Sequence, residues 1–424
     1  MTSARRSDAF ALCADRRRWV IVAVIFVAMV FNYLDRQIVA ILKPVLKSEF
    51  ALDDAGYAVL LNLFTVCYAV MYPVSGWLVD RFGPRLVLGV GVIGWSLACI
   101  GGGLARTIGV FGGFRAMLGL AEPTNYPSQL KVVAIWFPAR LRATANSLCV
   151  AGGSIGAIIA PPTIAWLAIA HGWRSVFLVS GAIGLLISLV WFLVYRDPPA
   201  EVVEEVRASA PQAFSDTRYS WGQLWRTRSL WGILLIRFVS DPVWYFCLFW
   251  LPGYLQEDSG LTLLQVGMVG WIPFLAADLG SIASAAWSDR MVRRGVSPLL
   301  ARKRMLTAVG LLAPLCVLTP YLPNAAATLI VFSLVAVAAL SWLFTLSVVI
   351  AEAFPVGNAA SVLGIAGGFG AAGAVVFNYF VGQLIGSVGA AQIFLVMAFL
   401  HPIAIAILWT MVREERTQSR PASQ

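Results

Sequence analysis

Charged residues are scarce in this sequence: Asp, Glu, Lys and Arg make up 12% of its 424 residues, against roughly a quarter in a soluble globular chain. So few charges cannot coat a water-exposed surface of this size, which argues against a soluble protein. Hydrophobic residues make up 59%, and they form long runs such as 19–31, 86–104 and 175–195. Because about 20 apolar residues in a helix cross a bilayer, the composition predicts an all-α integral membrane protein.

Residues typical of catalytic and metal sites are also rare. The sequence has two histidines, and neither belongs to the HExxH motif of zinc hydrolases. None of its four lysines follows a glycine, so there is no Walker A loop, and its six cysteines form no CxxC pair. We therefore expect no enzyme activity, no metal and no cofactor. Any energy for moving a solute would come from an ion gradient, such as a proton gradient, or from the solute's own gradient.

The formal net charge of +10 does not indicate nucleic-acid binding, because the arginines lie between the apolar runs rather than along one solvated face. If the N-terminus is cytoplasmic, most of the 31 Lys and Arg residues fall on the inner side. The outer loops then hold only Lys43, Lys47, Arg106 and Arg174. By the positive-inside rule, this asymmetry predicts a multi-pass protein with both termini in the cytoplasm.

Apolar runs bounded by charge, Pro or Gly predict twelve transmembrane helices. A polar region at 196–228 divides them into two six-helix bundles, 1–195 and 229–412, followed by a cytoplasmic tail at 413–424. The predicted spans are 19–41, 55–79, 86–105, 109–136, 144–170, 174–195, 229–256, 264–288, 304–321, 326–350, 359–385 and 391–412. The halves also repeat short patterns: Trp77, Asp80 and Arg81 correspond to Trp287, Asp289 and Arg290. Two pseudo-symmetric bundles from a duplicated unit are therefore expected.

The segment GWLVDRFGPR, residues 76–85, matches the pattern G-x-L-x-D-R-x-G-x-R between predicted helices two and three. This pattern resembles the signature loop of the major facilitator superfamily, a fold of twelve helices. We expect a gate in which Gly76 permits close helix approach and Asp80 faces a helix N-terminus or an arginine across the interface. The alternative is a loop that only sets topology. The gating residues would be Gly76, Asp80, Arg81, Gly83, Arg85, Asp289 and Arg290.

Charged residues lie inside predicted helices one and four, where each costs on the order of 2.5–3.5 kcal/mol at mid-membrane. Asp35 and Arg36 belong to helix one, and Arg115 and Glu122 lie two turns apart on one face of helix four. They are either structural ion pairs or a functional group. We favour function, because an arginine whose carboxylate partner takes up a proton becomes free to bind an anion.

Residues 113–143, GFRAMLGLAEPTNYPSQLKVVAIWFPARLRA, and 153–162, GSIGAIIAPP, resemble the anion:cation symporter branch of this superfamily. The branch includes bacterial hexuronate, galactonate and glucarate carriers and the animal sialin and vesicular glutamate carriers. The resemblance implies that Arg36 contacts the substrate carboxylate and that Arg115 pairs with Glu122. It further implies proton-coupling roles for Asp35 and Glu122, and contacts to the hydroxyls of a sugar acid from Tyr33 and Tyr68. Asn378 is a candidate partner for those hydroxyls from the other half. Trp244 offers a face for a sugar ring, although aromatic residues in membrane helices more often serve packing or anchor the helix at the interface.

Helix seven carries a further charged pair, Arg237 and Asp241, spaced i to i+4. Either the two residues form a local pair, or they face the cavity where Asp241-Pro242 is expected to break the helix. The sequence leaves both interpretations open.

These observations predict a proton-coupled symporter that imports a small organic anion, a hexuronate or an aldonate, as a monomer in the bacterial cytoplasmic membrane. Asp35 stands where hexuronate carriers of the branch tend to have a neutral residue and galactonate-like carriers have Asp, so the sugar acid stays open. One alternative is an exporter of organic anions or drugs, against which Arg36 and Arg115 argue. Another is a membrane solute sensor, which would be expected to carry a signalling domain.

Overall fold

The computed structural model describes residues 2–208, 219–354 and 356–413, and nearly all of them are helical. The helices of the first half are α1 (Thr2–Ile41), α2 (Lys43–Glu49), α3 (Asp54–Leu104), α4 (Ile108–Ala121), η1 (Glu122–Thr124), α5 (Asn125–Trp136), α6 (Ala139–His171) and α7 (Trp173–Val194). Between the halves lie α8 (Ala200–Ala208) and α9 (Trp221–Arg226). The second half contains α10 (Arg228–Phe249), α11 (Leu251–Glu257), α12 (Leu263–Val269), α13 (Ile272–Arg293), α14 (Pro298–Gly310), η2 (Ala313–Tyr321), α15 (Ala325–Ala353), α16 (Val356–Val388) and α17 (Ala390–Met411).

Ten stretches of the described residues are long and apolar enough to cross a membrane. One of them, α3, is 51 residues long and turns at Gly83, whose φ of 79° lies in the left-handed region that favours glycine. Helices α4 and α5, joined by the 3-10 turn η1, form one further membrane-crossing segment. Counted in this way, the arrangement is consistent with the predicted twelve crossings.

Large apolar side chains cover the outside of the helices. Leu193, Ile282 and Ile330, from three different helices, are each more than half exposed. In water such a surface would drive association, whereas in lipid every backbone group is satisfied within the helices and apolar side chains suit their surroundings. The fold is that of an all-α integral membrane protein, as the composition predicts.

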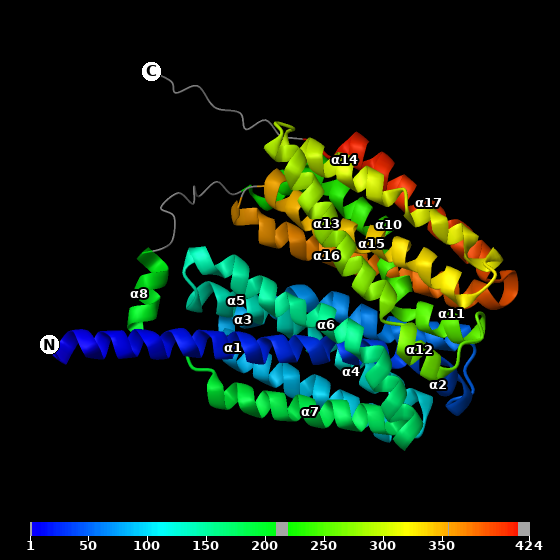
Figure 1. The fold of residues 1–424 in the computed structure, drawn as a ribbon, viewed down its shortest axis with the longest axis horizontal. Helices are drawn as coiled ribbons and strands as arrows, with labels where there is room; N and C mark the ends of the chain where they lie inside the picture. Colours follow the sequence, from blue (N-terminus) through cyan, green and yellow to red (C-terminus); the bar gives the residue numbers. More distant parts are fainter. Residues whose placement is uncertain (1, 209–218, 355, 414–424) are drawn as a thin grey trace.

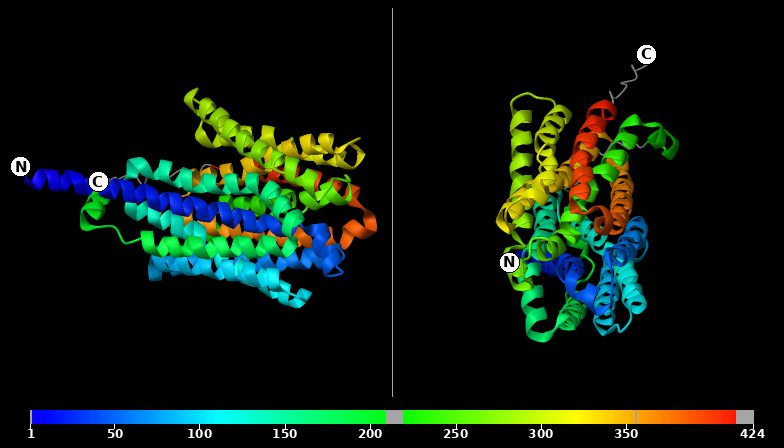
Figure 2. Two further views of the ribbon diagram at one scale, coloured as in Figure 1. Left: turned by 60° about the horizontal axis from the view of Figure 1, so that its bottom comes forward. Right: turned by 90° about the vertical axis from the view of Figure 1, so that its right-hand side faces the viewer.

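Two bundles lie side by side along the long axis of the molecule, α1–α7 in one and α10–α17 in the other (Figure 1; Figure 2). The halves contact each other where α3 packs against α16 and α6 against α12, and α2 faces α11 at one end of the molecule, which we call the α2 end (Figure 1). The other end carries α8 and is called the α8 end. It also holds the start of α1 and the end of α17, where Ser229 donates to the carbonyl oxygen of Arg413 at 3.2 Å. Both described ends of the chain thus lie on one side, as an even number of crossings requires.

Two local expectations are wrong. Helix α10 continues through Pro242 to Phe249 and ends at Trp250, so Asp241-Pro242 does not break it. Proline removes one backbone donor, and the surrounding α15, α16 and α17 keep the helix intact. The fourth crossing, predicted as one helix over 109–136, is instead interrupted at Glu122–Thr124. Parts of the predicted linker, 209–218, and of the predicted tail, 414–424, lie outside the described residues.

Candidate substrate site and its gates

The centre of the first bundle contains a buried ion pair between α1 and η1. Arg36 Nε lies 2.7 Å from Glu122 Oε2, and Arg36 Nη2 donates to Asn32 Oδ1 at 3.1 Å. Glu122 is 1% exposed, whereas the side chain of Arg36 keeps 12% of its surface accessible. The guanidinium therefore has one carboxylate partner and one open side, which suits the binding of a second anion.

The predicted pairing of Arg115 with Glu122 is wrong. Glu122 still continues the α-helical backbone of α4, with φ −60° and ψ −36° and its N–H bonded to the carbonyl oxygen of Leu118, so the helix phase does not separate it from Arg115. Glu122 instead bonds to Arg36. Arg115 is 3% exposed, and its three guanidinium nitrogens have no hydrogen-bond partner among the described residues. Its charge lies over the ring of Phe64, 4.9 Å from the centroid.

Asp35 points away from Arg36, toward α7. Its carboxylate accepts a hydrogen bond from Ser180, and the whole residue is buried. Arg115 and Glu122 both lie within electrostatic reach of it. The four charged residues predicted from the sequence are thus gathered in one region, with Arg36 facing the interior between the halves and Asp35 behind it.

Aromatic rings flank the open side of Arg36. Its guanidinium carbon lies 5.1 Å from the ring centroid of Tyr33 and 4.6 Å from that of Tyr68. Tyr72 continues the row one turn further along α3, 5.7 Å from Tyr68. Opposite this row, a Cβ built on Gly364 or Gly368 of α16 would meet no atom within 4 Å. A Cβ on Gly367 of the same helix would lie 3.9 Å from Tyr72, so α16 faces the half-buried tyrosines.

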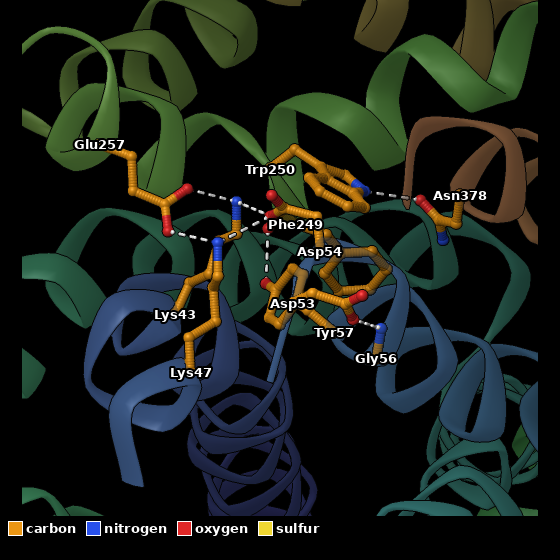
Figure 3. Close-up of polar contacts among 10 residues, drawn as sticks. All are labelled: Lys43, Lys47, Asp53, Asp54, Gly56, Tyr57, Phe249, Trp250, Glu257 and Asn378. Atoms are coloured by element: carbon orange, nitrogen blue, oxygen red, sulfur yellow. Dashed lines mark hydrogen bonds and ion pairs between the residues drawn. The ribbon is translucent and has the colours of Figure 1, made fainter. Parts of the chain in front are cut away.

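The second half contributes less than predicted to this region. Trp244 is half-buried and packs edge-on against Phe274, with centroids 6.1 Å apart. Asn378 is fully buried, and its Oδ1 accepts a hydrogen bond from Trp250 Nε1 at 3.0 Å. In this conformation Asn378 is part of the packing around Trp250 at the α2 end (Figure 3).

The α2 end is closed by an ion-pair cluster that the sequence analysis did not identify (Figure 3). Lys43 Nζ lies 2.8 Å from Asp54 Oδ1 and 2.6 Å from Glu257 Oε2, and only 2% of its side chain is exposed. Lys47 contacts the same two carboxylates at 3.1 and 3.2 Å. Because Glu257 belongs to α11, both lysines join the two halves. The available signal was that two of the chain's four lysines stand one helical turn apart between apolar runs.

Uncharged contacts extend this closure. The hydroxyl of Tyr57 donates to the carbonyl oxygen of Phe249 at 2.8 Å, and Gln256 Nε2 donates to the carbonyl oxygen of Ile41 at 2.9 Å. The ammonium of Lys43 lies 4.9 Å from the Trp250 ring, and a Cβ on Gly253 would come within 2.4 Å of the Lys43 chain. The lysine therefore fits tightly against α11, and the α2 end is sealed.

The predicted gating loops at the α8 end are arranged differently. Asp80 pairs with Lys131 at 2.7 Å, inside its own half, and not with a helix N-terminus or an arginine across the interface as predicted. A Cβ on Gly76 would meet nothing within 4 Å, so the predicted close approach there is also wrong. Arg81 and Arg85 are exposed, and Arg85 donates to the carbonyl oxygen of Phe192 at 3.2 Å.

The ion pairs of the corresponding loop in the second half also lie within a single half. Arg302 lies 2.6 Å from Asp289 and 3.3 Å from Glu352, while Arg290 is exposed. Arg302 and its two carboxylate partners all belong to the second bundle. Each gating loop thus holds its own half together, and none of these ion pairs joins the halves at the α8 end. The α2 end is sealed by ion pairs between the halves, whereas the ion pairs described at the α8 end do not connect the halves.

Comparison with known proteins agrees with this architecture. Residues 25–346 match the Major Facilitator Superfamily, and the chain belongs to this family of membrane transporters, which are not enzymes. It is 29% identical to the hexuronate transporter of Escherichia coli K12, covering 96% of this chain and 98% of that one. It is 32% identical to the galacturonate transporter of Dickeya chrysanthemi, covering 62% of this chain and 79% of that one. A bacterial homologue of the human lysosomal transporter Spinster, in an inward-facing occupied conformation, superposes with a TM-score of 0.77 at 17% identity, over 94% and 97% of the two chains.

Proposed function

We propose that this chain imports a sugar acid, a hexuronate or an aldonate, together with protons across the bacterial cytoplasmic membrane. One observation carries the proposal: Arg36 lies against two tyrosine rings and keeps 12% of its side chain accessible, with Glu122 as its only carboxylate partner among the described residues. The two similar transporters, one of hexuronates and one of galacturonate, support the same class of solute. The rings of Tyr33 and Tyr68 offer hydroxyls and apolar faces to a polyol chain.

Coupling to protons follows from competition for one guanidinium. Arginine binds a carboxylate through two parallel hydrogen bonds, and here the Nε edge is held by Glu122. When the substrate carboxylate takes this place, Glu122 is left buried without its hydrogen-bonded cation, and proton uptake relieves the cost of that isolated charge. Asp35, buried behind Arg36, is proposed as the second proton carrier. Loss of the protons restores the Arg36–Glu122 pair and favours release.

Alternating access explains how substrate would move in one direction across the membrane. With the α8 end in the cytoplasm, the conformation described here is the one from which substrate leaves toward the cell interior. Opening the α2 end requires the Lys43 cluster to separate, after which Arg36 becomes reachable from the opposite side. Substrate and proton bind better together than separately, and this differential affinity drives the exchange between conformations.

The proposal is tested with full-length protein in proteoliposomes carrying an inward proton gradient. We expect Arg36→Lys to lower galacturonate or galactonate uptake at least about a hundredfold, because an ammonium cannot replace the two-point contact. Arg174→Lys is the matched control, since Arg174 pairs with Glu49 on the surface at 2.7 Å. Uptake by Arg36→Lys equal to that of the control would contradict the binding role.

The coupling is tested separately. Glu122→Gln and Asp35→Asn should abolish accumulation against a concentration gradient while exchange of labelled for unlabelled substrate continues. Undiminished accumulation in either variant would contradict proton coupling through that residue. An exporter of organic anions is the second candidate, and the same vesicles distinguish it: it would expel solute from right-side-out vesicles under this gradient.

A further inference from the structure

A second buried ion pair lies in the other half of the molecule, on α10, and the carboxylate-binding step does not use it. Arg237 Nε lies 3.1 Å from Asp241 Oδ2, one helical turn along, and both residues are more than nine-tenths buried. Arg237 Nη1 also donates to the carbonyl oxygen of Leu343 at 3.4 Å. A Cβ on Gly370 of α16 would collide with the Asp241 carboxylate, so only glycine leaves room for the pair there.

This pair and the Arg36 site face the same row of tyrosines from opposite halves. Tyr245, half-buried on α10, lies within electrostatic reach of Arg36 as well as of Arg237 and Asp241. Tyr72 is likewise reached by Arg237, and its ring lies 5.7 Å from Tyr68, which covers Arg36. Gly367 of α16 stands 3.9 Å from Tyr72, beside two glycines that border open space. The row of tyrosines therefore connects the surroundings of Arg36 with those of the α10 pair.

The two pairs differ in what they offer a ligand. Arg36 takes a carboxylate by exchanging Glu122, which lies on another element and can be released. Arg237 and Asp241 are fixed one turn apart on a single helix, so the positive charge stays compensated. A compensated pair presents guanidinium donors and carboxylate acceptors together, which matches hydroxyl groups. It repels a second carboxylate, because Asp241 would face it at short range in a site of low dielectric.

We propose that Arg237 and Asp241 bind the hydroxylated end of a sugar monoacid and that Asp241 excludes sugar diacids. This inference rests on the proposed function, since it assumes that the carboxylate end is held at Arg36. Asp241 is thereby the specificity-determining residue between aldonates or uronates, with one carboxylate, and aldarates, with two.

The test measures binding to the purified full-length protein of galacturonate, galactonate and galactarate, which share one carbon skeleton and differ in oxidation at the ends. The wild type should bind the better of the two monoacids at least tenfold more tightly than galactarate. Asp241→Asn removes the negative charge, keeps the shape and leaves Arg237 uncompensated. The ratio of monoacid affinity to galactarate affinity should then fall at least tenfold. Glu49→Gln, which breaks a surface pair with Arg174, should leave the ratio unchanged.

Two results would overturn the inference: an unchanged ratio in Asp241→Asn, or equal binding of monoacid and diacid by the wild type. If Asp241→Asn does not fold, glycerate binding to the wild type still tests the inference. Glycerate, which has a carboxylate but lacks the distal hydroxyls, should then bind at least tenfold more weakly than the monoacid, and equal binding would contradict the proposal. Failure of the proposed function looks different, because Arg36→Lys would then retain full binding of every acid, whatever the ratio.

Discussion

The two ends of the molecule use ion pairs in opposite ways. At the α2 end, Lys43 and Lys47 of the first half pair with Glu257 of the second. At the α8 end, Asp80 pairs with Lys131 and Arg302 with Asp289, each within one half. Pairs inside a half can persist while the halves move apart, whereas pairs between halves must break. The difference indicates two rigid bundles that rock about a centre, with the α2 end as the closed contact of this conformation.

The ion pairs at the two ends also differ in how deeply their residues are buried. Lys43 is almost wholly buried, while the carboxylates of Asp80 and Asp289 are 71% and 51% exposed. Removing one partner of a buried pair costs about 3–5 kcal/mol, but exposed pairs contribute only about 0–1 kcal/mol. Substitutions at the two ends should therefore differ both in size and in which equilibrium they change.

The largest effect is expected from Lys43→Met. The substitution leaves Asp54 and Glu257 facing each other without the buried ammonium, so the population open at the α2 end should rise at least about tenfold. Spin labels at Ser48 and Ser387, both exposed at this end, report the distance between the halves. Arg174→Gln, which breaks a surface pair inside the first half, serves as control. An unchanged distance distribution in Lys43→Met would show that the cluster does not hold the halves together.

A smaller shift of the same kind is expected from Lys47→Met. Lys47 contacts the same carboxylates, but 22% of its side chain is exposed and its contacts are longer than those of Lys43. We expect a change of about twofold to fivefold in the open population with the same labels, equivalent to about 0.4–1 kcal/mol. An effect as large as that of Lys43→Met would mean that burial does not set the strength of these contacts.

Much of this architecture was predictable from the sequence, and the exceptions have physical causes. Both bounds of α7 and the end of α6 follow from apolar runs, because lipid imposes length and composition on a crossing helix, whereas α6 starts five residues earlier than predicted, in a polar stretch. The partner of Glu122 was not predictable, since Arg36 lies 86 positions away on another helix. The contact of Lys43 with Glu257 joins residues 214 positions apart. Only the placement of the halves brings them together, and no local pattern encodes it.

At the α8 end, Asp289→Asn tests the other side of the comparison. The substitution removes one of two carboxylates from Arg302, but Glu352 remains 3.3 Å away and Asp289 is half exposed. We expect a loss of thermal stability of no more than about 2–4 °C, with no change in the Ser48–Ser387 distance distribution. A shift of that distribution comparable to the one in Lys43→Met would show that the pair couples to the opposite end, against the rigid-bundle interpretation.

The smallest expected effect is a pH dependence of the closure at Lys47. Burial alone lowers the pKa of its ammonium, but the hydrogen bond to Asp54 and the charges of Glu257 and Asp54 outweigh burial and raise the pKa above the ordinary 10.5. A group with a raised pKa stabilises the closed form fully below the ordinary value, and this contribution disappears as the pH rises through the raised one. The wild type should therefore open slightly more at pH 11 than at pH 8. Lys47→Met should lack this increment in the label distances, and an identical pH response in both proteins would assign it to another group.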